Sequence, residues 1–179
     1  LPFLMPSPLA SSGRAGVALF GLAKAPIYGG TGSGSVVPSA PVSPWDAITA
    51  VGGPAHARGF TSFLDHTADG VTEAAKAAAT AEISLVFVGT ISGEGADRQT
   101  LGLGIGDNAD QDELVGAVCG ASVRCVVVVC TPGAVLLPWA HNSSVSAILT
   151  VFMPGQQFGP AIAELLFGDA NPSGKLPLT

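Results

Sequence analysis

Residues 83–101 have the sequence ISLVFVGTISGEGADRQTL, and the fold of the chain follows most directly from them. The first part, 83–89, is a short apolar and β-branched run, which predicts a buried strand that ends in a glycine. The second part places three charged side chains just past the carboxyl end of that strand, the edge where open α/β sheets bind ligands. Glycines on both sides of Glu94 allow a tight loop from which its carboxylate projects. Glu94 is therefore the first candidate for chemistry.

The rest of the chain alternates strands and helices around this central strand. Apolar β-branched runs predict further strands at 16–21, 60–64, 124–130 and 145–152. Capping residues, first-turn acids and helix-forming residues predict helices at 44–51, 67–81, 110–120 and 156–167. The alternation indicates a three-layer α/β/α sandwich around a mainly parallel sheet of about six strands.

The composition suits one globular domain and argues against several classes of partner. We expect an irregular leading segment at 1–15, which contains three prolines, and one α/β domain at 16–179. The net charge is −6 and the seven basic residues are scattered, whereas a nucleic-acid surface needs a positive stripe. No run approaches the roughly 18 apolar residues of a membrane span. We therefore expect neither nucleic acid nor a membrane span.

The three cysteines and one asparagine bear on the compartment of the protein. Cys119, Cys125 and Cys130 match neither a CxxC motif nor a metal-ligand spacing. We expect buried free thiols, because free cysteine packs as a small hydrophobe, and no disulfide framework is predicted. Asn142-Ser143-Ser144 fits the N-glycosylation sequon, whereas proline excludes Asn171-Pro172-Ser173.

A second loop, YGGTGSGS at 28–35, follows the first predicted strand and should reach the same edge of the sheet. It matches neither the P-loop pattern nor the dinucleotide fingerprint, and no helix follows it promptly. Three interpretations stay open: a phosphate cradle, a flexible linker, and an ordered loop that lines a cleft. We favour the ordered loop, which would place it beside Glu94.

The ordered set of motifs resembles the C-terminal α/β sandwich domain of glycoside hydrolase family 3, the β-glucosidase family. The resemblance covers about residue 13 to the end, and no single motif is specific by itself. The matching segments, in family order, are YGGTGSGS at 28–35 with Ser43-Pro44, VFVG at 86–89, SGEGADR at 92–98, DQDEL at 110–114, TPG at 131–133, MPGQ at 153–156 and FGDANPSGKLP at 167–177.

The resemblance implies one half of a retaining glycosidase that hydrolyses the O-glycosyl bonds of a β-glucoside or oligosaccharide. It assigns Glu94 as the general acid/base, while the nucleophilic aspartate belongs to a barrel domain that this sequence does not contain. An acid that protonates a departing oxygen must still hold its proton near working pH, and the nucleophile must lie roughly 5 Å away. The chain alone is therefore expected to be inactive. The resemblance implies no metal and no cofactor.

Further residues of the two loops are candidates for substrate binding. They are Gly30, Thr31, Gly32, Ser33, Asp97 and Arg98. Asp97 beside Arg98 is also open to a structural interpretation, as an ion pair that holds the loop. The family commonly has a proline and a shorter link where this chain has GLGIGDNA at 102–109, so we expect a displaced loop behind Glu94.

Other interpretations of the whole chain stay open. In the simplest of them, Glu94 is a solvated acid of the loop. In another, the domain is a non-catalytic carbohydrate-binding or assembly module that has lost its barrel. A small-nucleotide binder fits the fold but lacks the phosphate loop. The compartment is unknown, and the family resemblance together with the Asn142 sequon slightly favours a secreted or extracytoplasmic location.

Overall fold

A five-stranded parallel sheet lies at the centre of the structure, a computed structural model that describes residues 16–24, 29, 32–52, 56–58, 68–103 and 110–178. The strands are β1 (Val17–Gly21), β2 (His56–Arg58), β3 (Ile83–Gly89), β4 (Cys125–Cys130) and β5 (Ala147–Val151). Their order across the sheet is β2-β1-β3-β4-β5, and every neighbouring pair is parallel. The predicted sandwich is confirmed, with five strands in the described part of the chain instead of about six.

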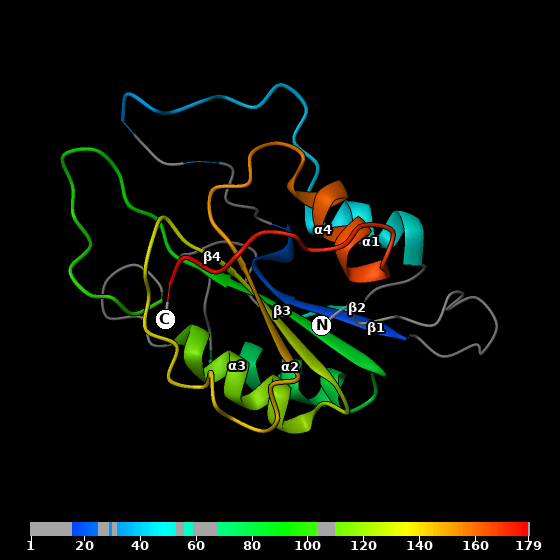
Figure 1. Cartoon of the computed structure of the whole chain (residues 1–179). Helices are drawn as coiled ribbons and strands as arrows, with labels where there is room; N and C mark the ends of the chain where they lie inside the picture. The colour runs from blue at the N-terminus through cyan, green and yellow to red at the C-terminus, as the bar shows by residue number, and fades with distance from the viewer. Residues whose placement is uncertain are drawn as a thin grey trace.

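The helices cover both faces of the sheet, as Figure 1 shows. The helices α1 (Pro44–Gly52) and α4 (Phe158–Phe167) pack together on one face, and α2 (Ala68–Ala78) and α3 (Asp110–Ala121) pack on the other. A short 3₁₀ turn, η1 (Leu22–Lys24), follows β1. The predicted edge strand at 60–64 lies outside the described residues, and the strand that pairs with β1 at the edge is β2.

Alternate residues of the central strands fill two separate cores. On β3, Leu85 and Phe87 point to the side of α1 and α4, whereas Val86 and Val88 point to the side of α2 and α3. All four side chains are at most 1% exposed. A strand buried on both faces needs a continuous apolar run, which is why the sequence of β3 shows no polar alternation.

The connection from β4 to β5 lacks a helix. Residues 131–146 form turns and irregular structure that cover the α3 side of the sheet. Trp139 is buried in this connection, and its indole N–H donates a 2.7 Å hydrogen bond to Asp112 on α3. Burial raises the pKa of the Asp112 carboxyl, and the hydrogen bond from Trp139 offsets part of that rise. The indole thus joins the core on the side of α2 and α3.

The order of the strands places a switch point between β1 and β3. The chain leaves β1 toward α1 on one face and leaves β3 toward α3 on the other face, so the two outgoing segments diverge at the carboxyl edge of the sheet. Such a divergence opens a crevice between the two segments, where ligands of doubly wound sheets bind. The segment after β1 contains Ser33, and the segment after β3 contains Glu94.

Cys119 and Cys125 form a disulfide, which corrects the expectation of free thiols. Cys119 lies in the last turn of α3 and Cys125 begins β4, and the tight turn between them brings their Cα atoms to 5.1 Å. Neighbouring elements in the fold thus create a pairing that the spacing alone does not reveal. Cys130 is a buried free thiol as predicted, and burial raises its pKa to about 12.

Candidate active site

Glu94 stands at the corner of a tight turn that follows β3. The backbone N–H of Ala96 donates to the carbonyl of Gly93 at 3.3 Å, and the two residues form an isolated antiparallel bridge. Gly95 has a positive φ of 77°, which a turn with this arrangement requires at its third residue and which glycine adopts without strain. The glycine on the C-terminal side of Glu94 therefore shapes the turn that projects the carboxylate.

Ser33 of the segment after β1 binds the Glu94 carboxylate. The Ser33 hydroxyl donates to Oε2 at 2.5 Å, and the Ser33 backbone N–H donates to the same oxygen at 2.7 Å. The other oxygen, Oε1, has no hydrogen-bond partner among the described residues. The two loops predicted to share an edge of the sheet thus meet directly, and one carboxylate oxygen stays open to an incoming group.

Gly32 makes this contact possible because it approaches Glu94 closely. Its φ is +88°, and a Cβ at this position would clash with the Cβ of Glu94 and lie 2.8 Å from Oε2. Gly34, two residues further on, has open space around its Cα. The glycine requirement in this loop therefore falls on Gly32, where both the backbone conformation and the packing exclude a side chain.

The pKa of the Glu94 carboxyl lies below its ordinary value. The hydrogen bond from the Ser33 side chain lowers its pKa most, the bond from the Ser33 backbone N–H lowers it further, and a small loss of solvation acts in the opposite direction. Glu94 is fully exposed in this chain. An acid catalyst needs a raised pKa, whereas the contacts described in this chain lower the pKa of Glu94.

Gln111 anchors the end of β3 from which the Glu94 loop departs. This buried side chain accepts a 2.8 Å hydrogen bond from the N–H of Gly89 and donates a 2.9 Å bond to the carbonyl of the same residue. Gln111 therefore ties the first turn of α3 to the carboxyl end of β3. Sequence reasoning missed this role, since a single glutamine in a helix start carries no pattern that marks it.

Arg98 holds the Glu94 loop in a different way from the predicted one. No ion pair joins it to Asp97 within the described part of the chain. Instead, its Nη2 donates a 2.8 Å hydrogen bond to the carbonyl of Ala134, 36 residues away in the β4–β5 connection. The partner of the Arg98 guanidinium is therefore the backbone carbonyl of Ala134, which the fold brings close, and not the carboxylate of the adjacent Asp97. Asp97 and Arg98 both line a hollow of about 420 Å³, together with Ser92 and Gln99.

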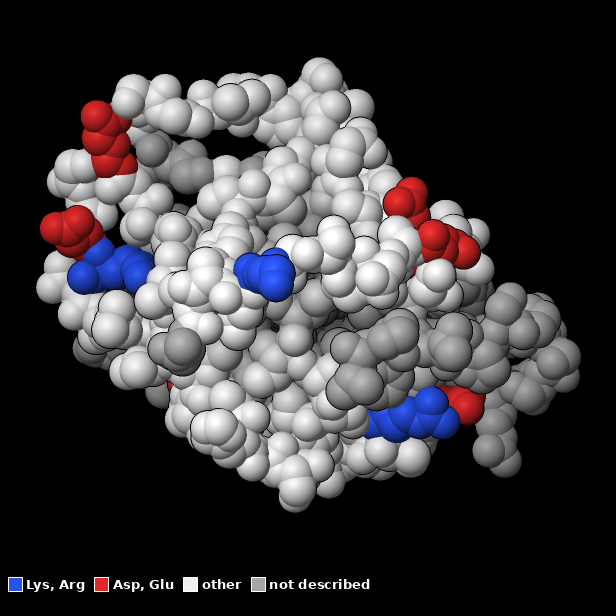
Figure 2. Space-filling view, viewed as in Figure 1, with Lys and Arg blue, Asp and Glu red and all other residues white. Residues whose placement is uncertain are grey.

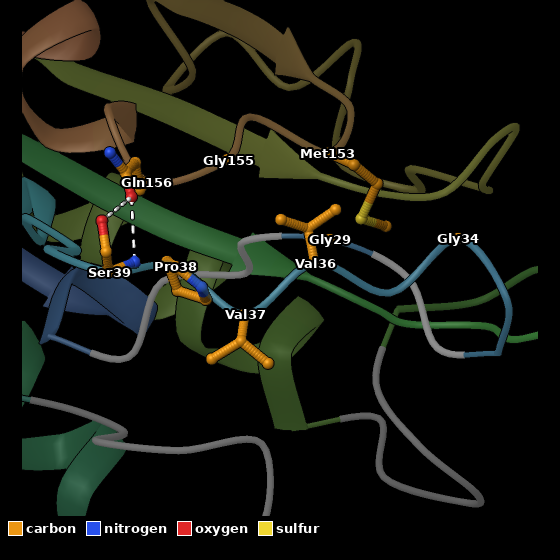
Figure 3. Close-up of a pocket in the computed structure, with 9 residues that line it drawn as sticks. All are labelled: Gly29, Gly34, Val36, Val37, Pro38, Ser39, Met153, Gly155 and Gln156. Carbon is orange, nitrogen blue, oxygen red and sulfur yellow. Dashed lines mark hydrogen bonds between the residues drawn. The ribbon is translucent and has the colours of Figure 1, made fainter.

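A second, larger hollow of about 600 Å³ lies between the segment after β1 and the segment that joins β5 to α4. Figure 3 shows the Met153 and Val36 side chains on its wall and the Gln156 amide bound to Ser39. Gln156 Oε1 accepts hydrogen bonds from the N–H and hydroxyl of Ser39, at 3.1 and 3.3 Å. Glu94 lines neither hollow. The candidate residues Gly30 and Thr31 lie outside the described residues.

The charge distribution, the possible metal ligands and the length of the helices are three further properties of the described residues. On the face in Figure 2, Lys and Arg side chains stand in separate places with uncharged surface between them. No group of three or more His, Cys, Asp or Glu side chains gathers as metal ligands would in the described ranges. The helices described also include none that is both long and apolar enough to cross a bilayer.

Residues 7–179 match the profile of the glycosyl hydrolase family 3 C-terminal domain. The chain is similar to a protein named probable β-glucosidase L from Aspergillus fumigatus, at 39% identity over 155 residues, which are 84% of this chain and 20% of that protein. A β-glucosidase from Schizophyllum commune is 36% identical over 145 residues, which are 77% of this chain and 73% of that protein.

The fold also matches solved structures. The crystal structure of β-glucosidase D2-BGL from Chaetomella raphigera superimposes on 98% of this chain with a TM-score of 0.78 and 29% sequence identity, and the match covers 26% of that chain. The present chain therefore spans about a quarter of the Chaetomella chain and one fifth of the Aspergillus protein.

Proposed function

The chain belongs to glycosyl hydrolase family 3 through the C-terminal domain of that family, and from this premise we propose that it supplies the general acid/base of a retaining β-glucosidase. In this proposal Glu94 gives a proton to the departing glycosidic oxygen of a β-glucoside or oligosaccharide. As a carboxylate it then takes a proton from the water that attacks the glycosyl-enzyme intermediate. The nucleophilic carboxylate comes from a barrel domain on the same polypeptide or on another chain.

The observation that carries the proposal is the asymmetric binding of the Glu94 carboxylate. Two hydrogen bonds from Ser33 fix Oε2 at the switch point of the sheet, and Oε1 has no hydrogen-bond partner within the described ranges. A catalytic carboxylate needs one oxygen that is held and one that faces the reacting atom. Ser33 therefore acts through Glu94 as a positioning residue, which refines its predicted role in substrate binding.

The ionised state of Glu94 fits the second half of such a reaction, in which a base is needed. The first half needs the acid form, so the pKa must rise when the site is complete. A barrel and a bound sugar that cover Glu94 would remove water from the carboxyl, and loss of solvation raises the pKa of a carboxyl. The proposal therefore requires the barrel for acidity as well as for the nucleophile.

The remaining loop residues are proposed to contact the sugar. Asp97 is exposed and has no hydrogen-bond partner among the described residues, so its carboxylate is free to accept bonds from sugar hydroxyls. Arg98 holds the loop through Ala134, and its second terminal nitrogen, Nη1, is buried without a partner among those residues. Gly32 is proposed as a further sugar contact, as are Gly30 and Thr31, which lie outside the described residues.

The test uses the natively purified protein that contains this chain, with Glu94→Gln and Glu164→Gln as matched variants. Glu164 is an exposed glutamate on α4, remote in sequence from the loops, so its variant controls for the loss of one charge. Hydrolysis of an aryl β-glucoside with a poor leaving group should fall by about 100-fold or more in Glu94→Gln, the usual contribution of acid–base catalysis. Glu164→Gln should keep the parental rate.

A second substrate separates the acid role from general damage to the site. An aryl glucoside with a highly activated leaving group needs no protonation, so Glu94→Gln should still form the glycosyl-enzyme intermediate from it. Added azide should then accelerate turnover and yield the glucosyl azide, because an anionic nucleophile needs no base. Equal hydrolysis of the poor substrate by Glu94→Gln and the parent protein would disprove the role of Glu94.

The second candidate function is a non-catalytic carbohydrate-binding or assembly module. The exposure of Glu94 and its lowered pKa favour it, because an exposed carboxyl whose pKa is lowered is a poor proton donor. Native material that has the mass of this chain alone, 17.7 kDa, and that does not hydrolyse either substrate would support the module over the enzyme.

A further inference from the structure

The sequon Asn142-Ser143-Ser144 lies on an exposed turn just before β5. The backbone N–H of Asn142 donates to the backbone carbonyl of Trp139 at 2.9 Å, which anchors the turn to a residue whose side chain is buried. The backbone N–H of Ser144 donates to Asn142 Oδ1 at 3.0 Å. This hydrogen bond to Oδ1 fixes the orientation of the Asn142 side chain. Its amide nitrogen, Nδ2, has no hydrogen-bond partner among the described residues, and Asn142 is exposed.

The disulfide lies at the same end of the sheet as the sequon. The N–H of Cys125 donates to the Ser146 hydroxyl at 3.2 Å, and the N–H of Ser146 donates to the carbonyl of Cys125 at 2.8 Å. Only Val145 therefore separates the sequon from Ser146, the residue that contacts Cys125. Disulfides persist in secreted proteins and in oxidising compartments, which are also where asparagine acquires glycans. The two features are independent of one another and indicate the same compartment.

We propose that Asn142 carries an N-linked glycan in a protein that folds in the secretory pathway. In the transfer step, Nδ2 of Asn142 attacks the anomeric carbon of a lipid-pyrophosphate-linked oligosaccharide. A carbon–nitrogen bond forms, the carbon–oxygen bond to the pyrophosphate breaks, the lipid pyrophosphate leaves, and the amide gives up one proton. The step is a group transfer without oxidation, and the lipid-linked sugar donor is its only co-reactant.

The position of the turn leaves the candidate active site open. Asn142 precedes the amino end of β5, whereas Glu94 follows the carboxyl end of β3, and the strands are parallel. The two residues therefore lie at opposite edges of the sheet, about 20 Å apart for strands of this length. The glycan should not affect hydrolysis, so this proposal stands or falls separately from the proposed function.

The first experiment examines the native protein from its natural source. An amidase that releases N-glycans hydrolyses the bond between Cγ and Nδ2 and so converts each modified asparagine to aspartate, and peptide mass spectrometry should place that conversion at Asn142 and not at Asn171. Thiol labelling after denaturation should modify one of the three cysteines without reductant and all three after reduction. An unconverted Asn142, or three reactive thiols without reductant, would overturn the proposal.

The second experiment changes the sequon in the full-length protein, secreted from a eukaryotic host. Ser144→Ala should abolish the mass of one glycan and Ser144→Thr should keep it, because the transferase recognises either hydroxyl residue at that position. Pro172→Ala serves as the matched control, since it opens the exposed but blocked sequon at Asn171. A glycan gained in Pro172→Ala together with none in the parent protein would show that the host is competent and that Asn142 is not a site.

Discussion

At the scale of single residues, the Ser33 hydroxyl controls the acidity of Glu94. Ser33→Ala removes the hydrogen bond that lowers the pKa of the Glu94 carboxyl most, so that pKa should rise toward its ordinary value. A ¹³C NMR titration of the glutamate side chains measures the shift. Ser35→Ala is the matched control, because its exposed hydroxyl does not contact Glu94.

The same substitution should change how stability depends on pH. The pKa of Glu94 is lower in the folded chain than in the unfolded chain, so the bonds from Ser33 contribute their full stability above the unfolded pKa. That contribution is lost as pH falls through the folded pKa. Urea unfolding of the parent and Ser33→Ala should therefore differ more at neutral pH than in strong acid, and a constant difference would contradict the assignment.

Gly32 and Gly34 form a second matched pair. Gly32→Ala places a methyl group against Glu94 at a positive φ, so it should displace the loop, break the Ser33 bonds and cost roughly 1 kcal/mol or more of unfolding free energy. Gly34→Ala meets open space and should be nearly neutral or slightly stabilising. Denaturant unfolding of both variants measures the costs, and equal costs would contradict the close approach of Gly32.

At the scale of elements, Gln111 joins α3 to the carboxyl end of β3. Gln111→Ala leaves the N–H and the carbonyl of Gly89 without their partners in a buried place, which should cost about 1–3 kcal/mol of unfolding free energy. Gln157→Ala is the control, because Gln157 is exposed and makes no side-chain cap to α4. A loss of stability no larger than that of the control would show that water replaces the amide.

The strands were easier to predict from sequence than the contacts between them. Apolar β-branched runs mark β1, β3 and β4 to within one residue, because full burial on two faces demands such runs. The three-residue β2 has no such run, since an edge strand takes its conformation from the partner β1. The start of α4 is two residues later than predicted, because residues 156–157 form a turn and Gln157 is the N-cap.

The candidate site could be predicted only in part, because the contacts that complete it join residues far apart in the sequence. The glycines around Glu94 signal a tight turn, and two strand-loop units signal a shared edge. The partners that complete the site come from remote positions: Ser33 is 61 residues from Glu94, and Ala134 is 36 residues from Arg98. Such pairings depend on strand order and register, and composition and spacing do not encode either of them.

At the scale of the whole molecule, the proposed function predicts that the pKa of Glu94 is higher in the active protein than in this chain. If a barrel covers the site, kcat/KM should fall on the alkaline side through a pKa above the ordinary value for glutamate, because the acid form is the active one. The pH–rate profile of the native protein measures this limb. In Glu94→Gln, assayed with the activated aryl glucoside, that limb should disappear, and an unchanged limb would assign it to another group.

The divergence of the chain at the β1/β3 switch point also has a kinetic consequence. Ser33 and Glu94 can meet only after β1 has paired with β3, and the long intervening segment makes that closure entropically costly. The contact should therefore form after the rate-limiting step of folding. Ser33→Ala should then accelerate unfolding and leave the folding rate nearly unchanged, with a φ-value close to zero. With this order of assembly, the contact between the Ser33 and Glu94 loops would be the last in the domain to form and the first to open.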